Sequence, residues 1–538
     1  MTELQDLLRE LVDRDLENSP VRATQLGVPG HDDRLGDYSE KALEAQETWE
    51  RDLLARFEAV DSSALTADES IDLDLAISEL RGRAILHDWP DWRRSPDGYL
   101  GECLYGAFML FLHRLRPDAE LVDACVDRLA QIPAVLDHAR ANLDPGLATP
   151  ELVRRAAGMC QAGVSYVRDF LPAEVGDDKL AQRLADAGAR AAAAFEDFLP
   201  FLADLADRAS GGFALGESRY TRLLEEREAL GYGLAELHQR GWRAHDAIVD
   251  EMASLAETIA GTRDFRAVVA DAQADHPLTP EAMRDAYAEW TARARAFLDE
   301  RGLVTFPEGE RCEVVPSPPF LRPMSAVASY MRPPAFTDSR VGHFNVPYPP
   351  DGSTPEDTQQ RLAMNNHFAI PTVAVHEAYP GHHWHLAVAA GNPSPVRKVY
   401  GSSYMAEGWG LYTEQMMREE GFYPDPRMDL CQLDMRLFRA CRIIVDTALH
   451  AGDMGMEEAV TLMQDHAGAT EPVARAEVLR YCGWPTQAPS YLTGSIELER
   501  IRADYLSQGR GDLRSFHDTL AASGVLPLGL AERAVMGG

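Results

Sequence analysis

Cysteine is scarce in this chain, and no cysteine pair has the spacing of a metal-binding or redox motif. Among 538 residues there are seven cysteines, an odd number, and none forms a CxxC pair. Disulfide frameworks use even numbers of cysteines in short exported chains. The pattern argues against a disulfide scaffold and a cysteine zinc site, and it indicates reduced thiols in the cytoplasm.

Long apolar runs and positive charge are also lacking. No stretch approaches the roughly 18 apolar residues that a membrane-spanning helix needs. The opening MTELQDLLRELVDRDL has an amphipathic acidic pattern that differs from a secretory signal. Lysine and arginine number 52 against 86 aspartates and glutamates, a formal charge of −34, which repels phosphates and anionic lipids. We therefore expect a cytoplasmic protein that binds neither nucleic acid nor membrane; the sequence predicts no oligomeric state.

The sequence changes in character near residue 300. Before it, apolar residues recur at helical spacing, as in LVDACVDRLAQIPAVLDHARANL. Residues 303–350 are dense in proline, aromatic and β-branched residues, which favour short strands and ordered loops. Helical patterning resumes at Thr354, a candidate N-cap followed by Pro355. We predict a mainly α fold with a small β-containing segment at 303–350. A helical N-terminal region (1–300) and a metal-binding catalytic region (301–538) would form one continuous unit.

Four histidines fall within the ten residues HEAYPGHHWH that begin at His376. In the HExxH motif, two histidines one helical turn apart reach the same zinc ion, and the glutamate lies beside the metal's water. Here Pro380 stands where the second histidine would be. On a regular helix His382 is rotated by roughly 120° from His376, and His383 lies about 10.5 Å further along the axis. Neither reaches the same ion without distortion.

Pro380 and Gly381 can supply that distortion, because proline kinks a helix and glycine allows dihedral angles that other residues resist. If two residues bulge out, His382 takes the place of the second histidine; if three do, His383 takes it. The alternative, a surface helix end with clustered histidines, leaves the glutamate and the Pro-Gly pair unexplained. The pattern favours His376 and His382 as metal ligands, with His383 as the alternative.

A carboxylate is expected as the third ligand, since open metal sites commonly combine two histidines with one carboxylate. The best donor is Glu407 in SYMAEGWGLYTEQ, because enough chain separates it from His376 for a connection and a returning helix. Glu414 lies seven residues later on the same helix face. It is either a partner of a metal ligand or a surface carboxylate.

The strings HEAYPGHH, EGWGLYTE, RIIVDTALH and RYCGWPTQAPSYLTG resemble the bacterial domain of unknown function 885 family, which is grouped with the zincin-like metallopeptidases. PVRATQLGVPGHDDRL near the start resembles the same family, so the resemblance spans nearly the whole chain. It implies a large helical gluzincin-type fold with a deep active-site cleft, one wall of which the N-terminal region forms. It also implies His376, His382 and Glu407 as ligands and Glu377 as general base, and it implies no substrate.

Polar residues recur at helical spacing in the predicted helix that contains RIIVDTALH. Arg442, Asp446 and His450 recur at i, i+4 and i+8 in an otherwise apolar helix, so they need partners if buried. They form a salt bridge between helices, or they place His450 near the metal as a donor to the transition state with Asp446 orienting it.

The proline-rich segment RYCGWPTQAPSYLTG contains the candidate phenol. Tyr491 follows the loop and is expected either to stabilise the oxyanion or to pack in the core. Thr486 and Pro489 depart from the pattern of the family, which puts the shape of the loop in question. The sequence gives no role to Arg480.

These residues predict a zinc-dependent hydrolase, a metallopeptidase with one zinc ion per chain that cleaves short peptides or a small amide. Two alternatives keep the metal. A non-haem iron enzyme uses the same two-histidine, one-carboxylate set, and a helical binding module could hold a metal for structure alone. Glu377 favours the hydrolase, because the iron enzymes need no glutamate directly after the first histidine.

Overall fold

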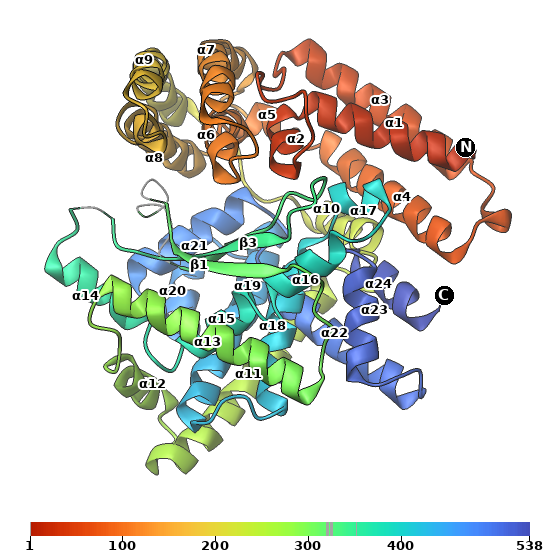
Figure 1. The fold of residues 1–538 in the computed structure, drawn as a ribbon, viewed down its shortest axis with the longest axis vertical. Helices are drawn as coiled ribbons and strands as arrows, with labels where there is room; N and C mark the ends of the chain where they lie inside the picture. Colours follow the sequence, from red (N-terminus) through yellow and green to blue (C-terminus); the bar gives the residue numbers. More distant parts are fainter. Residues whose placement is uncertain (1, 319–321, 323–326, 351, 538) are drawn as a thin grey trace. The chain divides into compact units, whose positions relative to one another are not determined.

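The chain folds mainly into α-helices, with one small β-sheet (Figure 1). The computed structural model describes residues 2–318, 322, 327–350 and 352–537. Over these residues no helix combines the length and the apolar character that crossing a membrane requires. The predicted mainly α fold is confirmed.

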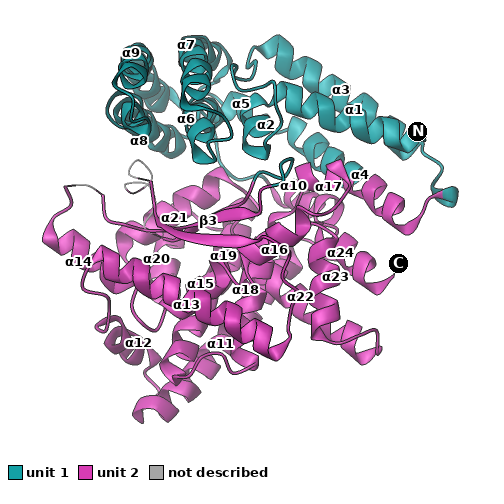
Figure 2. Cartoon of the chain, viewed as in Figure 1, with its two compact units in different colours: residues 1–64, 76–215, 334–338 teal, residues 65–75, 216–333, 339–538 magenta. Residues whose placement is uncertain are grey.

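The chain divides into two compact units (Figure 2). Unit 1 comprises residues 1–64, 76–215 and 334–338, and unit 2 comprises residues 65–75, 216–333 and 339–538. The division passes through α4 (Ala67–His87). The boundary expected at residues 300/301 therefore falls inside unit 2, because residues 216–300 group with the metal-binding region.

Some helices of unit 1 begin at capping residues. Thr2 and Gln5 form a reciprocal capping box at the start of α1, and the Asp177 carboxylate accepts backbone N–H groups at the start of α9. The buried face of α9 packs against α7 and α8. Besides part of α4, the unit contains α1 (Glu3–Asn18), α2 (Pro20–Leu26), α3 (Glu40–Glu58), η1 (Ser62–Ala64), α5 (Asp91–Arg94), α6 (Asp97–Leu112), α7 (Asp118–Asn142), α8 (Pro150–Ser165), η2 (Tyr166–Phe170), η3 (Leu171–Glu174) and α9 (Asp178–Arg208).

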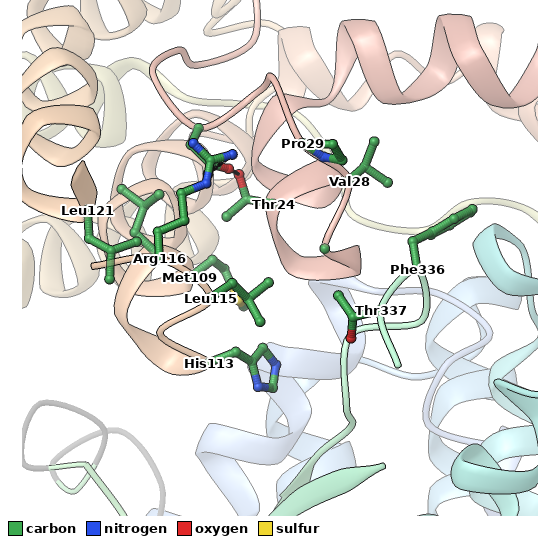
Figure 3. A pocket seen from close by; sticks show the side chains of 13 residues that line it. Thr24, Val28, Pro29, Met109, His113, Leu115, Arg116, Leu121, Phe336 and Thr337 are labelled. Carbon is green, nitrogen blue, oxygen red and sulfur yellow. Dashed lines mark hydrogen bonds and ion pairs between the residues drawn. The ribbon is translucent and has the colours of Figure 1, made fainter. Parts of the chain in front are cut away.

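A cavity of about 380 Å³ lies within unit 1 (Figure 3). Met109 and Leu121 contribute apolar surface to its lining. The Arg116 guanidinium in its wall pairs with Asp32 at 2.9 Å between Nη2 and Oδ2. The lining includes none of the residues that the sequence places at the metal site.

Unit 2 holds the sheet and the remaining helices. In Figure 1, α15, α18 and α19 lie together in the middle of this unit, and their contacts agree. Its helices are α10 (Glu217–Arg222), η4 (Leu223–Arg227), α11 (Leu234–Ala260), α12 (Phe265–Gln273), α13 (Pro280–Arg301), α14 (Pro355–Met364), α15 (Ile370–Glu377), α16 (His382–Ala389), α17 (Pro395–Val399), α18 (Ser403–Glu419), α19 (Pro426–Ala451), α20 (Met456–Ala467), α21 (Glu471–Gly483), α22 (Ser490–Ser507), α23 (Leu513–Ala522) and α24 (Leu528–Met536).

The sheet has three strands in the order β1-β3-β2. β1 (Arg311–Pro316) runs parallel to β3 (Val341–Val346), and β2 (Ser329–Met331) runs antiparallel to β3. The strands confirm the β-containing segment expected at 303–350, of which residues 319–321 and 323–326 lie outside the described residues. The predicted helix start is also confirmed, since the Thr354 hydroxyl accepts the Asp357 N–H and Pro355 opens α14.

Candidate metal centre

The motif HEAYPGHH folds as two short helices joined by a tight link. α15 ends at Glu377, and α16 begins at His382. The Gly381 N–H donates to the carbonyl of Val375 at 3.0 Å, so the link folds back on the end of α15. A Cβ at Gly381 would lie 1.9 Å from the His376 carbonyl oxygen, so only glycine fits there. The expected distortion is present, since the helix is interrupted between Glu377 and His382. The Gly381 N–H donates to the Val375 carbonyl and the Trp384 N–H to the Ala378 carbonyl, and each bond spans two residues more than the regular helical bond.

The link brings His376 and His382 to the same carboxylate. The Oε2 atom of Glu407 lies 3.7 Å from Nε2 of His376 and 3.4 Å from Nε2 of His382. The donor atoms of the three residues all lie within 4.8 Å of one another. Donors bound tetrahedrally to zinc at roughly 2.1 Å are about 3.4 Å apart. The three residues therefore have the donor types and the spacing that a zinc ion requires.

Glu414 fixes the orientation of the His376 ring. Its Oε1 lies 2.7 Å from Nδ1 of His376, and its side chain is 1% exposed. Glu414 is therefore a buried partner of a candidate ligand, and the alternative of a surface carboxylate is wrong. With Nδ1–H donated to Glu414, Nε2 faces the cluster, and it would offer a metal ion its lone pair once the ion displaces its proton.

The ionisable groups of the cluster strongly affect one another's pKa values. Burial opposes a charge on His376, but hydrogen bonds with Glu407 and Glu414 raise its pKa to about 10. Burial would also raise the pKa of Glu407, yet His376 and His382 hold it well below its usual value. Buried carboxylates and imidazoles that stabilise one another in this way are typical of a site that holds a cation.

Glu377 lies in the last turn of α15, directly after the first candidate ligand, and it is buried. Burial raises the pKa of its carboxyl group, although the positive charges of His376 and His382 act against this shift. A carboxylate with a raised pKa can both accept and return a proton near neutral pH. Its position and environment suit a general base.

His383 is engaged elsewhere. Its Nε2 lies 2.7 Å from Oε2 of Glu310, and its Nδ1 lies 3.0 Å from the hydroxyl of Tyr330. The Tyr379 hydroxyl donates to the same Glu310 oxygen at 2.6 Å. Both ring nitrogens of His383 are therefore used in this network, and the structure brings His382, not His383, to Glu407.

Close contacts between helices hold Glu407 in place. A Cβ at Gly408 would lie 2.5 Å from the Cα of Gly494, so α18 and α22 approach each other at two glycines. A Cβ at Gly410 would lie 2.5 Å from Cε1 of His376, so the glycine leaves space for the imidazole. The Trp409 indole N–H donates to the Pro380 carbonyl at 2.7 Å and ties α18 to the link.

Tyr491 lies in the first turn of α22, close to this group. Burial raises the pKa of its phenol, and the negative charge of Glu407 adds to the shift. The guanidinium carbon of Arg442 lies 4.8 Å from the centre of its ring. The phenol of Tyr491 is thus within the electrostatic influence of one candidate ligand, Glu407.

His450 lies in a different set of contacts. It is wholly buried in α19, and its Nε2 lies 3.1 Å from the carbonyl oxygen of Tyr481. Asp446 accepts from the Tyr220 hydroxyl at 2.5 Å and from the Thr486 N–H at 3.3 Å. These contacts match the expected role of a polar bridge between helices, and they lend no support to His450 as a donor at the metal.

The roles of several residues around the cluster were not predicted from the sequence. Glu310 and Tyr330 bind His383 from far along the chain, and Gly410 lies against the imidazole of His376. Arg439 has its guanidinium carbon 5.8 Å from the ring centre of Tyr491. Of these contacts, the sequence indicated only that of Gly410, because the glycines of the GWG pattern beside Glu407 lie within a predicted helix and such glycines mark close packing.

Comparison with known proteins supports the fold and gives no activity. A candidate lipoprotein of unknown function from Shewanella oneidensis has a similar structure, with a TM-score of 0.81, 23% identity and 100% of both chains covered. A candidate lipoprotein from Colwellia psychrerythraea has a TM-score of 0.84 at 19% identity, over 99% of this chain and 98% of that one. No curated protein matches the chain. Residues 20–535 match the bacterial proteins of unknown function grouped as DUF885, and the chain belongs to this family.

Proposed function

We propose that the chain is a zinc-dependent hydrolase, a metallopeptidase of the zincin-like, gluzincin type that cleaves short peptides or a small amide. The observation that carries the proposal is the convergence of His376, His382 and Glu407 beside the buried Glu377. Two histidines and a carboxylate leave a fourth position open on a tetrahedral zinc ion, which is the pattern of catalytic zinc sites. Glu414 accepts a hydrogen bond from Nδ1 of His376, and zinc sites commonly have such a carboxylate partner for a ligand histidine.

Each residue of the candidate site has its own role in the proposed amide hydrolysis. A zinc ion held by the three ligands would supply a Lewis acid that polarises the carbonyl group and lowers the pKa of water. Glu377 takes a proton from the attacking water, whose oxygen joins the carbonyl carbon. The C–N bond then breaks, and Glu377 returns the proton to the leaving amine. Tyr491 is the candidate donor to the oxyanion.

Metal content tests the ligand set directly. Elemental mass spectrometry should find about one zinc ion per wild-type chain, and none in His376→Ala, His382→Ala or Glu407→Ala. His276→Ala is the matched control, because that imidazole contacts the adjacent Pro277 carbonyl and is not among the candidate ligands. Retention of zinc in the His382 and Glu407 variants would contradict the ligand assignment.

Turnover tests the general base. Glu377→Gln keeps the size of the side chain and removes the proton acceptor, so it should retain zinc and lose about a hundredfold or more in kcat/KM on a library of short peptides. Full activity of this variant would favour a metal held for structure. Iron bound in place of zinc would favour the non-haem iron alternative.

The cytoplasmic location and the lack of membrane or nucleic acid partners stay predictions. The two solved relatives are described as candidate lipoproteins, and a lipid anchor would place a protein at a membrane surface. Fractionation of cells that produce the natural protein separates the two locations, since an anchored chain sediments with membranes and a cytoplasmic one does not.

A further inference from the structure

Two arginines of α19 lie beside Tyr491 with N–H groups that lack an acceptor. The guanidinium carbons of Arg439 and Arg442 lie 5.8 and 4.8 Å from the ring centre of Tyr491. Nε of both residues and Nη1 of Arg442 are buried, and they have no hydrogen-bond partner among the described residues. Buried N–H groups of charged side chains are costly without an acceptor. The two arginines are therefore suited to bind an anion.

The protein supplies only part of the opposite charge that this cluster needs. Nη2 of Arg442 lies 2.8 Å from Oε2 of Glu477, and Nη2 of Arg480 lies 3.0 Å from the same oxygen. The Tyr481 hydroxyl also donates to it, at 2.6 Å. One carboxylate is thus shared by two guanidinium groups, with that of Arg439 close by. Burial and the charge of Arg442 lower the pKa of Arg439, as expected for cations held together. Burial also acts against the charge of Arg442, but Tyr481 and Glu477 outweigh it and raise the pKa of Arg442.

The helix that carries both arginines packs against helices that carry candidate metal ligands. α19 packs against α15, α18 and α22, which carry His376, Glu407 and Tyr491. The charge of Glu414, the partner of His376, acts on Arg439, and the charge of Glu407 acts on Tyr491. An anion bound by the two guanidinium groups would therefore lie beside the position at which an amide bond would be hydrolysed.

We propose that Arg439 and Arg442 bind a carboxylate of the substrate, the C-terminal carboxylate of a short peptide or of an N-acyl amino acid. Guanidinium groups match the planar geometry of a carboxylate and bind it with paired hydrogen bonds. Holding this group next to the metal directs hydrolysis to the last amide bond of the substrate. The inference rests on the proposed hydrolase function and names its substrate class.

Binding to an inactive protein tests the subsite apart from turnover. The full-length Glu377→Gln protein is loaded with zinc and immobilised. It is then incubated with a library of N-acetyl dipeptides that covers all side-chain combinations. Each dipeptide is present both as the free acid and as the C-terminal amide. Mass spectrometry measures the ratio in which it retains the two forms. We expect the acids to be enriched about tenfold or more, and Arg442→Gln or Arg439→Gln to reduce this enrichment by about tenfold.

Matched variants separate the subsite from general effects. Arg475→Gln removes an exposed guanidinium of unit 2 and should leave the enrichment unchanged. Arg442→Lys keeps the charge without the paired geometry and should give an intermediate value if the fold is intact. Equal retention of acids and amides, retention of neither, or full enrichment in both Arg442→Gln and Arg439→Gln overturns the proposal. Enrichment that depends on the arginines, in a protein whose parent hydrolyses no peptide, would uphold the subsite and contradict the hydrolase.

Discussion

At the residue scale, Glu414 acts through His376. Its Oε1 holds Nδ1 of the imidazole at 2.7 Å from within the core. Glu414→Gln preserves the shape but removes the negative charge that strengthens the imidazole as a ligand. We expect zinc affinity to fall by about ten- to a hundredfold, measured by competition with a chelator of known affinity. Glu458→Gln, an exposed site on α20, should have no effect. Equal affinities in all three proteins would contradict a role for Glu414.

His517 predicts how stability depends on pH. Burial lowers its pKa to about 4 from an ordinary 6.5. Nδ1 donates to the Leu303 carbonyl at 2.9 Å, so neutral Nε2 accepts from the Tyr412 hydroxyl at 2.7 Å. Between these pKa values the unfolded state binds a proton that the folded state does not, so stability is lost as the pH falls. The loss from pH 7 to pH 5 is about 2 kcal/mol.

Urea denaturation of His517→Gln at both pH values checks this expectation. The variant should show a pH-dependent loss smaller than that of the wild type by about 2 kcal/mol. A pH dependence remains in the variant, because burial also lowers the pKa of His385, to about 3. Parallel pH profiles for the two proteins would show that His517 titrates normally in the folded state.

The choice between His382 and His383 shows what the sequence could predict at this scale. The pattern around Pro380 and Gly381 predicted a distorted motif and favoured His382, and it left His383 open. The structure separates the two because Glu310 and Tyr330 occupy both nitrogens of His383. Those partners come from the segment that forms the sheet, and no local spacing indicates such a contact.

At the scale of elements, the link between α15 and α16 depends on Gly381. A Cβ there would lie 1.9 Å from the His376 carbonyl oxygen and 2.2 Å from that of Val375, and both atoms belong to a helix backbone that cannot move aside cheaply. We expect Gly381→Ala to destabilise the protein by about 3 kcal/mol or more and to abolish zinc binding, because His376 and His382 would separate.

Thermal denaturation and metal analysis of the same samples measure both effects. Gly455→Ala is the control, since a Cβ at that position meets nothing within 4 Å. A Gly381→Ala protein with wild-type stability and one zinc ion per chain would show that the tight link between α15 and α16 is not required for the site.

Local signals predicted elements better than they predicted their pairing. Thr354 and Pro355 marked the start of α14, and the β-branched residues near 303–350 marked the strands. The parallel pairing of β1 with β3 joins residues such as Val314 and Phe344 across an intervening strand and loops. Pairing of this kind depends on long-range packing, which periodicity does not reveal.

At the scale of the whole molecule, the change in sequence character near residue 300 did not mark a boundary between the units. α11 belongs to unit 2 because it packs closely on α19: a Cβ at Gly241 would lie 2.8 Å from Cγ2 of Ile443. Helices look alike in sequence whether they pack with their neighbours in the chain or with distant ones. The mainly α class was therefore predictable, and the division into units was not.

Because of this division, we expect the proposed metal to stabilise the two units differently. All three candidate ligands belong to unit 2, on α15, α16 and α18. A ligand that binds only the folded state stabilises it by about 2.7 kcal/mol at a hundred times its dissociation constant. Amides of these helices that exchange when the site opens should gain about a hundredfold protection on zinc addition. Amides of α7 and α9 in unit 1 should not change.

Hydrogen exchange followed by mass spectrometry, with and without zinc, resolves these helices separately. His376→Ala removes one donor and should show no zinc-dependent gain in α15, α16 or α18. If protection rose equally in α7 and α9, the metal would stabilise the molecule as a whole. If it rose nowhere in the wild type, the cluster of His376, His382 and Glu407 would not be a zinc site, because a bound ion must slow the openings that release it.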